Sequence, residues 1–98
     1  VINNQDNKNQ EIKVYSANNL VNFDYSSNST STIEIYNIIG QKVKEIQKDA
    51  NTPLTYWNFE DSYGREVSNG PYFYKIFNDN QIYNGKIVKV DNSVYINK

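Results

Sequence analysis

The residue types that most often carry out enzyme chemistry are missing from this sequence or are spaced so that they cannot act together. The 98 residues include no histidine and no cysteine, so the usual general base and the Ser-His and Cys-His nucleophile pairs are absent. One pair of neighbouring carboxylates remains, Glu60 and Asp61. On an extended strand such neighbours point to opposite faces and cannot share a substrate bond. The sequence therefore predicts a protein that is not an enzyme.

Oxygen ligands for a hard cation are the other chemistry that the sequence offers. Glu60, Asp61 and Ser62 begin a polar turn, and Asp79 lies in another turn. Side chains of these types bind Ca²⁺, but an Asp at the start of a turn also caps backbone amides without any metal. Zinc, copper and iron lack their commonest ligands here. We predict no cofactor, with calcium as the one ion that this segment could hold.

The glycines are far apart, whereas a phosphate-binding loop needs them just ahead of a helix. We interpret them as residues of turns and strand ends: Gly40, Gly64, Gly70 and Gly85.

The charges are balanced and dispersed. Ten Lys and Arg residues stand against eleven Asp and Glu residues, with no long run of one sign. Nucleic acids and anionic membrane surfaces are bound by clustered cations, and no apolar stretch approaches the roughly 18 residues of a membrane span. We predict neither nucleic-acid binding nor membrane insertion.

The elements that position these residues are expected to be strands. Residues 1–10 are almost wholly Asn, Gln, Asp and Lys, which predicts a linker or frayed start, and residues 11–98 form one domain. The polar start without a methionine leads us to expect a piece of a longer protein. From residue 11 onward, apolar and polar residues alternate in short runs. These runs are 11–15, 20–26, 31–38, 52–59, 71–77 and 82–90.

Two segments allow two interpretations each. In residues 38–49, Ile39, Val43 and Ile46 fit a helical spacing, but Gly40 interrupts the series where a hairpin turn would lie and no helix cap precedes it. We favour a strand pair. Asn84-Gly85 has the composition of a hairpin turn, but the strand before it would be very short, so we predict a bulge at Gly85.

The many aromatic residues fit a core better than a binding surface. Tyr72, Tyr74 and Ile76 share one face of their run, and Trp57 and Phe59 share one face of another. Two inward faces of this kind predict an antiparallel sandwich. An exposed carbohydrate-binding patch would instead use Phe73, Phe77 or Tyr83. We also expect an open sheet edge near residues 81–90 that could pair with a partner strand.

Three blocks in a fixed order give the sequence a family resemblance over about residues 12–90. "IEIYNIIGQKVKEI" is followed by "YWNFEDSYGREVSNGPYFYKI" and then by "GKIVKV". In this order and spacing the chain resembles the C-terminal sorting domains of the type IX secretion system and the related immunoglobulin-like domain of flagellar hook-capping proteins. The residues that carry the resemblance are Tyr36, Gly40, Val43, Trp57, Gly64, Gly70, Tyr72 and Tyr74.

The resemblance implies an immunoglobulin-like β-sandwich of about seven strands at the C-terminus of a secreted protein, often a hydrolase. Such a domain is recognised by the secretion machinery, and its parent protein reaches the cell surface or the exterior through the periplasm. It implies a sorting role for the closing strand, Lys86, Ile87, Val88, Lys89 and Val90. The alternative is a retained spacer or adhesion module, whose partner would be a neighbouring catalytic domain of the same chain.

Overall fold

The structure, a computed structural model, describes residues 11–90 and 93–97, so the predicted linker at 1–10 lies outside the described residues. Every regular element in the described part is a strand, which confirms the predicted all-β fold. None of these residues belongs to a helix that could cross a membrane. The strands are β1 (Lys13–Ala17), β2 (Leu20–Asp24), β3 (Ser31–Tyr36), β4 (Lys42–Lys48), β5 (Leu54–Trp57), β6 (Gly70–Asn78), β7 (Gln81–Val90) and β8 (Ser93–Asn97).

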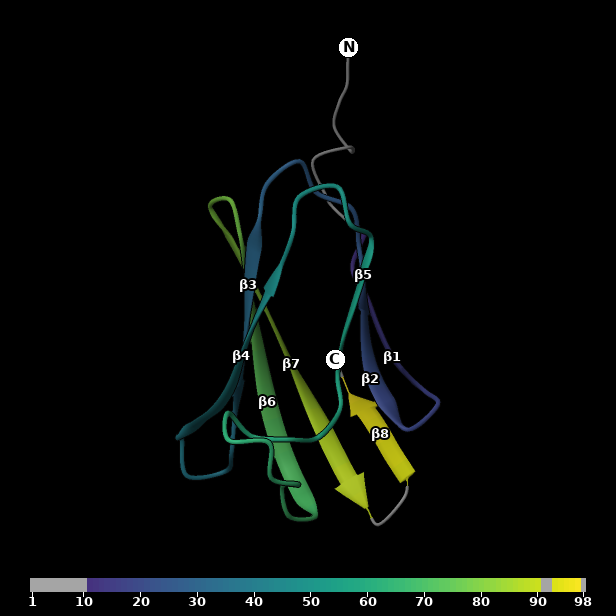
Figure 1. Cartoon of the computed structure of the whole chain (residues 1–98), viewed down its shortest axis with the longest axis vertical. Helices are drawn as coiled ribbons and strands as arrows, with labels where there is room; N and C mark the ends of the chain where they lie inside the picture. The colour runs from purple at the N-terminus through teal and green to yellow at the C-terminus, as the bar shows by residue number, and fades with distance from the viewer. Residues whose placement is uncertain (1–10, 91–92, 98) are drawn as a thin grey trace.

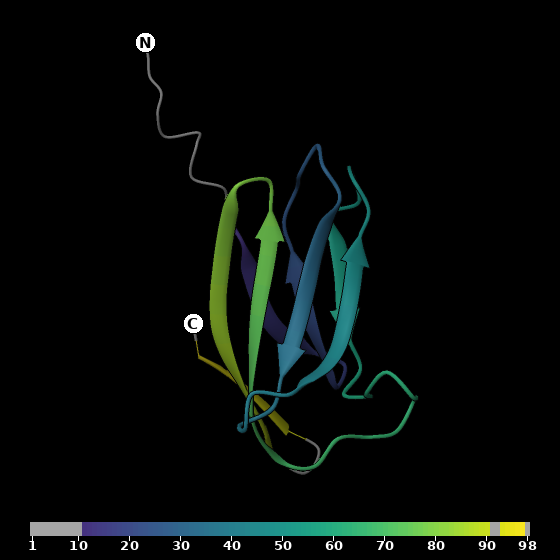
Figure 2. The same cartoon turned by 90° about the vertical axis from the view of Figure 1, so that its left-hand side faces the viewer.

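The strands form two antiparallel sheets that pack face to face (Figures 1 and 2). One sheet has three strands in the order β1-β2-β5, and the other has five in the order β4-β3-β6-β7-β8. The chain therefore crosses between the sheets after β2, after β4 and again after β5. β1, β2 and β5 thus lie in one sheet, and β3, β6 and β7 lie in the other. This division of the strands matches the immunoglobulin-like arrangement. The predicted sandwich is confirmed, and the described residues form eight strands in place of about seven.

The core lies between the sheets and contains the residues that the alternation predicts. Trp57 of β5 contacts Tyr72 of β6 with ring centroids 5.4 Å apart, and Phe23 of β2 contacts Tyr74 of β6 at 5.5 Å, both edge to face. Such pairs add to the burial of their large apolar area. The other fully or nearly buried apolar side chains are Val14, Val21, Tyr25, Ile33, Ile35, Phe59, Ile76 and Ile87.

The strand pair predicted in residues 38–49 is confirmed, because β4 pairs with β3 along its whole length. The turn between them is built on Asn37, whose Oδ1 accepts hydrogen bonds from the amides of Ile39 and Gln41 at 3.1 and 2.9 Å. Gly40 has a φ of 86°, a conformation that glycine adopts without steric cost. A short turn also follows β6, between Asn78 and Gln81.

The bulge predicted at Gly85 is wrong. The β6–β7 register runs without a shift through the pair of Tyr74 and Gly85, and the irregularity in this sheet lies between Ile35 and Tyr36. Gly85 is required for a different reason: a Cβ at this position would overlap the ring of Tyr74. The aromatic ring occupies the space that a side chain on β7 would otherwise fill.

The open edge expected near residues 81–90 is wrong for the second half of that segment. β8 pairs antiparallel with β7 from Lys86 to Val90, and Ile96 packs against the core. The sequence after residue 90 therefore supplies an edge strand. In the described part of the chain, the outer strands of the larger sheet are β4 and β8.

Candidate functional site

The closing strand β7 divides the predicted sorting residues between two faces. Ile87 is fully buried and Lys89 is 5% exposed, so both point into the sandwich. Lys86 is exposed, Val88 is half-buried and Val90 is 43% exposed. A strand places successive side chains on opposite faces, so the run is not one continuous surface, and only its outward residues can be contacted from outside.

Lys89 connects this strand to the long loop between β5 and β6. Its Nζ lies 3.2 Å from the Glu66 carboxylate and 3.2 Å from Oδ1 of Asn69, and 5.8 Å from the centroid of the Phe59 ring. The stem of Lys89 is buried while the ammonium reaches polar partners at the end of the sandwich, as long cationic side chains commonly do. The pattern of alternation predicts the inward direction of Lys89 but not its partners, which come from another block of the sequence.

The loop of residues 58–69 begins at a strained residue and is held at several points. Phe59 is buried and has a φ of 66°, which is rare for a bulky side chain. Its carbonyl accepts a hydrogen bond from the Val67 amide at 2.8 Å. The indole Nε1 of Trp57 donates to the carbonyl of Glu60 at 2.9 Å, and the hydroxyl of Tyr72 donates to the carbonyl of Ser68 at 2.6 Å. The core aromatics thus fix the backbone of the loop.

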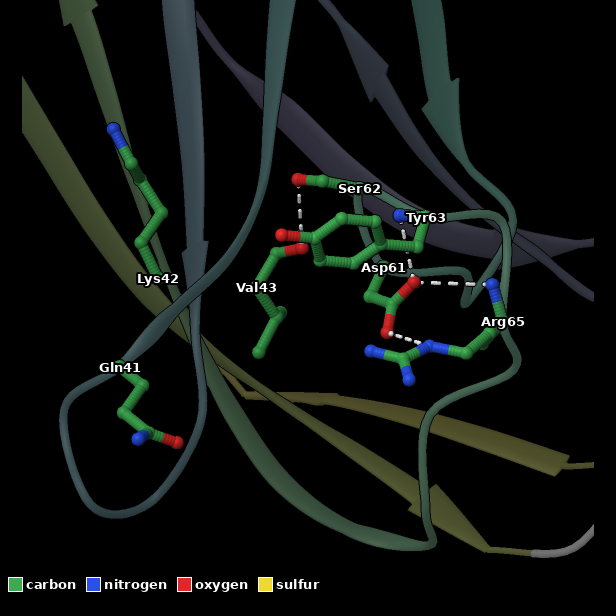
Figure 3. Close-up of a pocket in the computed structure, with 7 residues that line it drawn as sticks. All are labelled: Gln41, Lys42, Val43, Asp61, Ser62, Tyr63 and Arg65. Carbon is green, nitrogen blue, oxygen red and sulfur yellow. Dashed lines mark hydrogen bonds and ion pairs between the residues drawn. The ribbon is translucent and has the colours of Figure 1, made fainter.

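Asp61 organises the tip of this loop (Figure 3). Its carboxylate accepts hydrogen bonds from the amides of Tyr63 and Arg65 at 2.9 and 3.0 Å and from Nε of Arg65 at 3.1 Å. The pKa of Asp61 is lowered, first by the hydrogen bond from the Arg65 amide and then by the Tyr63 amide and the Arg65 charge. The amide of Ser62 donates to the carbonyl of Val43 at 3.0 Å and joins the tip to β4.

A hollow of about 420 Å³ lies between this loop tip and the start of β4. In Figure 3 the side chains of Asp61 and Arg65 face each other across their ion pair, while Lys42 points away from the loop. The hydroxyl of Ser62 donates to the carbonyl of Val43 at 3.3 Å. The acid and the hydroxyl of the loop tip are therefore both engaged within the fold. The hollow is lined by Gln41, Lys42, Val43, Asp61, Ser62, Tyr63 and Arg65.

The oxygen ligands considered for calcium are not brought together. Asp61 uses both carboxylate oxygens on loop donors, and Asp79 accepts a hydrogen bond from the hydroxyl of Ser29 at 2.7 Å in a different turn. In the residues that the structure describes, no three His, Cys, Asp or Glu side chains are grouped as metal ligands would be.

We expect Asp61→Asn to reduce the dependence of stability on acidic pH. A carboxylate whose pKa is lowered in the folded state stabilises the fold above the ordinary pKa of about 3.9, and this contribution is lost as the pH falls through the lower folded pKa. Urea unfolding midpoints at pH 7 and pH 3 should differ less in Asp61→Asn than in the wild type. Asp49→Asn, a change at an exposed carboxylate after β4, is the matched control, and an equal reduction there would contradict the assignment.

The residues that carry the family resemblance have structural roles. Trp57, Tyr72 and Tyr74 are buried. Gly40, Gly64 and Gly70 all have positive φ values, between 79° and 133°. Val43 packs partly buried against the core, and the Tyr36 hydroxyl donates a short hydrogen bond to Glu34 on the outer face of the larger sheet. Sequence reasoning identified these residues, and in the structure all of them except Tyr36 belong to the core or to its turns.

The three aromatics considered for a carbohydrate patch do not share a face. Phe73 and Phe77 lie on the outer face of β6, where Phe73 is 39% exposed. Tyr83 is partly buried against the core from the inner face of β7. Of the three alternatives, Phe73 and Phe77 lie on the outward side of the larger sheet and Tyr83 lies on the opposite side.

Sequence reasoning missed a buried lysine and an exposed pair of isoleucines. Lys48 is 1% exposed, and burial lowers its pKa. Its ammonium donates a hydrogen bond to the carbonyl of Thr52 and lies 4.3 Å from the centroid of the Tyr25 ring. Its spacing of two from Ile46 on β4 is the signal that places it inward. Ile38 and Ile39 are 68% and 73% exposed at the β3–β4 turn, and no pattern in the sequence marked them as exposed.

Comparison with known proteins gives one family. The chain matches the model of the secretion system C-terminal sorting domain over residues 13–90, which spans the described sandwich from the start of β1 to the end of β7. The comparison with curated proteins gave no match. The matched segment covers more than half of the chain and contains all three blocks of the predicted resemblance. The chain belongs to the family of secretion system C-terminal sorting domains.

Proposed function

We propose that this chain is the sorting signal through which the type IX secretion machinery exports an attached passenger protein. The passenger would cross from the periplasm to the cell surface or the medium. The observation that carries the proposal is the family match over residues 13–90. A domain of this family would leave catalytic activity to the passenger.

Within the domain, we assign the sorting role to the closing strand and its immediate neighbours. Lys86, Val88 and Val90 point outward on β7 and are available to a partner. Ile87 and Lys89 point inward and would act through the fold, Ile87 as core and Lys89 by holding the 58–69 loop. Substitutions of the two sets should therefore have different consequences for folding.

The test is export of a reporter protein that carries the complete chain at its C-terminus, in cells that have the secretion system. We expect the reporter in the medium or on the surface with the chain attached and in the periplasm without it. Lys86→Ala with Val88→Ser should reduce export while the purified fusion keeps its melting temperature. Ile87→Ala should lower the melting temperature as well, because it creates a cavity.

Export of the reporter without the chain would contradict the proposal. The mass of the exported protein then separates two uses of the domain. If residues 13–90 are removed after export, the domain serves only as a signal; if they remain, it also acts as a spacer or adhesion module on the mature protein.

A further inference from the structure

The turn between β3 and β4 displays two aliphatic side chains on a rigid support. Ile38 and Ile39 are 68% and 73% exposed, although turns usually carry polar residues. Asn37 holds the turn through its Oδ1 and also through its carbonyl, which accepts a hydrogen bond from the Gly40 amide at 3.0 Å. A contiguous exposed apolar patch, unlike single scattered apolar side chains, commonly marks a protein interaction site.

A mainly apolar hollow of about 330 Å³ lies beside this turn, on the outer face of the larger sheet. Its floor is the cross-strand pair of Tyr36 on β3 and Phe73 on β6. Phe73 in turn pairs with Lys86 on β7, so Lys86 lies next to a residue that lines the hollow. The hollow is lined by Tyr36, Asn37, Ile38, Gly40, Phe73 and Lys75.

The cations around the hollow differ in whether a carboxylate already neutralises them. Lys42 lies 2.7 Å from Glu45 and 3.5 Å from Glu34. Lys75 has its ammonium 5.7 Å from the centroid of the Tyr36 ring, and neither Lys75 nor Lys86 forms an ion pair with any residue in the described part of the chain. The two unpaired lysines flank Phe73, one on the same strand and one across from it.

We propose that the surface composed of Ile38, Ile39, Tyr36, Phe73, Lys75 and Lys86, which we call the Ile-Lys surface, docks a protein of the export machinery. The inference rests on the proposed function and adds the chemistry of the partner. That partner inserts an apolar side chain into the hollow and places Asp or Glu residues opposite Lys75 and Lys86. Complementary charges of this kind set partner choice and association rate.

A protein fits these features better than a membrane or a glycan does. Anionic membranes are bound by clusters of about four to eight cations, and the Ile-Lys surface has two that are unpaired. Within the Ile-Lys surface, the side chains of Ile38 and Ile39 are more exposed than that of Phe73. Aliphatic side chains pack against other aliphatic and aromatic side chains, whereas sugar recognition relies on flat aromatic faces.

The test is photo-crosslinking in secreting cells, with p-benzoylphenylalanine in place of Ile38 in the reporter carrying the full chain. Tyr56, which is 54% exposed on the opposite sheet, is the matched control position. We expect a covalent adduct with one protein from Ile38 and not from Tyr56, and a partner peptide with Asp or Glu beside the linked residue. Lys75→Glu with Lys86→Glu should reduce the amount of adduct about tenfold or more. Lys75→Arg with Lys86→Arg keeps the positive charges and should keep the adduct. Lys13→Glu, on β1, should leave the adduct unchanged.

Each other outcome overturns the inference in a defined way. An adduct with lipid, with glycan or with a second copy of the chain would show a different occupant. An adduct that the charge reversals do not reduce would show that the partner is not acidic. If removal of the chain blocks export but Ile38 gives no more adduct than Tyr56, the Ile-Lys surface is wrong and the sorting function stands. If removal of the chain leaves export intact, the sorting function itself is wrong.

Discussion

Replacing Trp57 by alanine is expected to lower the free energy of unfolding by about 3–5 kcal/mol. Trp57 is 1% exposed and contacts Phe59 and Tyr72, with ring centroids 5.0 and 5.4 Å away. The change leaves a cavity between the sheets and also removes the donor to the Glu60 carbonyl. Because domains of this size are stable by only about 5–15 kcal/mol, the variant should have a much lower urea midpoint, measured at pH 7 by circular dichroism.

Trp57→Phe is the control for this experiment. It keeps a ring in the core but loses the indole donor, so its cost should be clearly smaller than that of alanine. The loop of residues 58–69 should also become more sensitive to trypsin at Arg65 in both variants, because the indole bond to Glu60 fixes the start of the loop. A loss below about 1 kcal/mol for Trp57→Ala would mean that Trp57 is not a core residue, because a filled core position costs more when truncated.

The core could be predicted from the sequence because burial in a sandwich follows a period of two. Tyr72, Tyr74 and Ile76 were placed on one inward face by alternation alone, and all are buried; Val21 and Phe23, and Ile33 and Ile35, follow the same period of two and are also buried. The turn glycines were predictable for a similar reason, since positive φ values favour glycine at Gly40, Gly64 and Gly70. Sequence patterns were therefore sufficient where burial follows the strand alternation and where the backbone angle of a single turn residue decides.

The features that the sequence did not reveal depend on contacts between distant segments. Lys89 contacts Glu66 and Asn69, which come from a loop earlier in the chain whose path no local pattern defines. The bulge at Gly85 was inferred because a hairpin turn at Asn84-Gly85 would leave a very short strand before it, whereas the actual reason for the glycine is the ring of Tyr74 on the neighbouring strand. Such a requirement is visible only when the register between β6 and β7 is known.

The candidate site shows the same division between local and distant constraints. Alternation places Lys86, Val88 and Val90 outward and Ile87 and Lys89 inward, and the structure has them so. Alternation alone does not show that Phe73 lies beside Lys86, because that depends on the register between β6 and β7. The exposed isoleucines of the β3–β4 turn could not be predicted at all, because an apolar residue in a turn carries no sign of whether it is buried by tertiary structure.

Replacing Gly85 by alanine is expected to destabilise the domain by about 1–3 kcal/mol, the usual cost of overpacking a filled core. The added Cβ would overlap the ring of Tyr74, which is 3% exposed and lies 5.5 Å from Phe23 in an edge-to-face pair. The ring cannot move away without displacing Phe23, which is fully buried. Asn84→Ala, at the exposed neighbouring position on β7, should change stability by less than about 0.5 kcal/mol.

A double-mutant cycle with Tyr74→Ala identifies the cause of this loss. If the clash with the ring destabilises Gly85→Ala, the change should cost little in the Tyr74→Ala background, so the two effects would be strongly non-additive. Additive effects would show that the cost of Gly85→Ala arises from the strand backbone and not from the ring. Glycine would then occupy the middle of β7 for its flexibility rather than for the space that Tyr74 requires, and the steric explanation would be wrong.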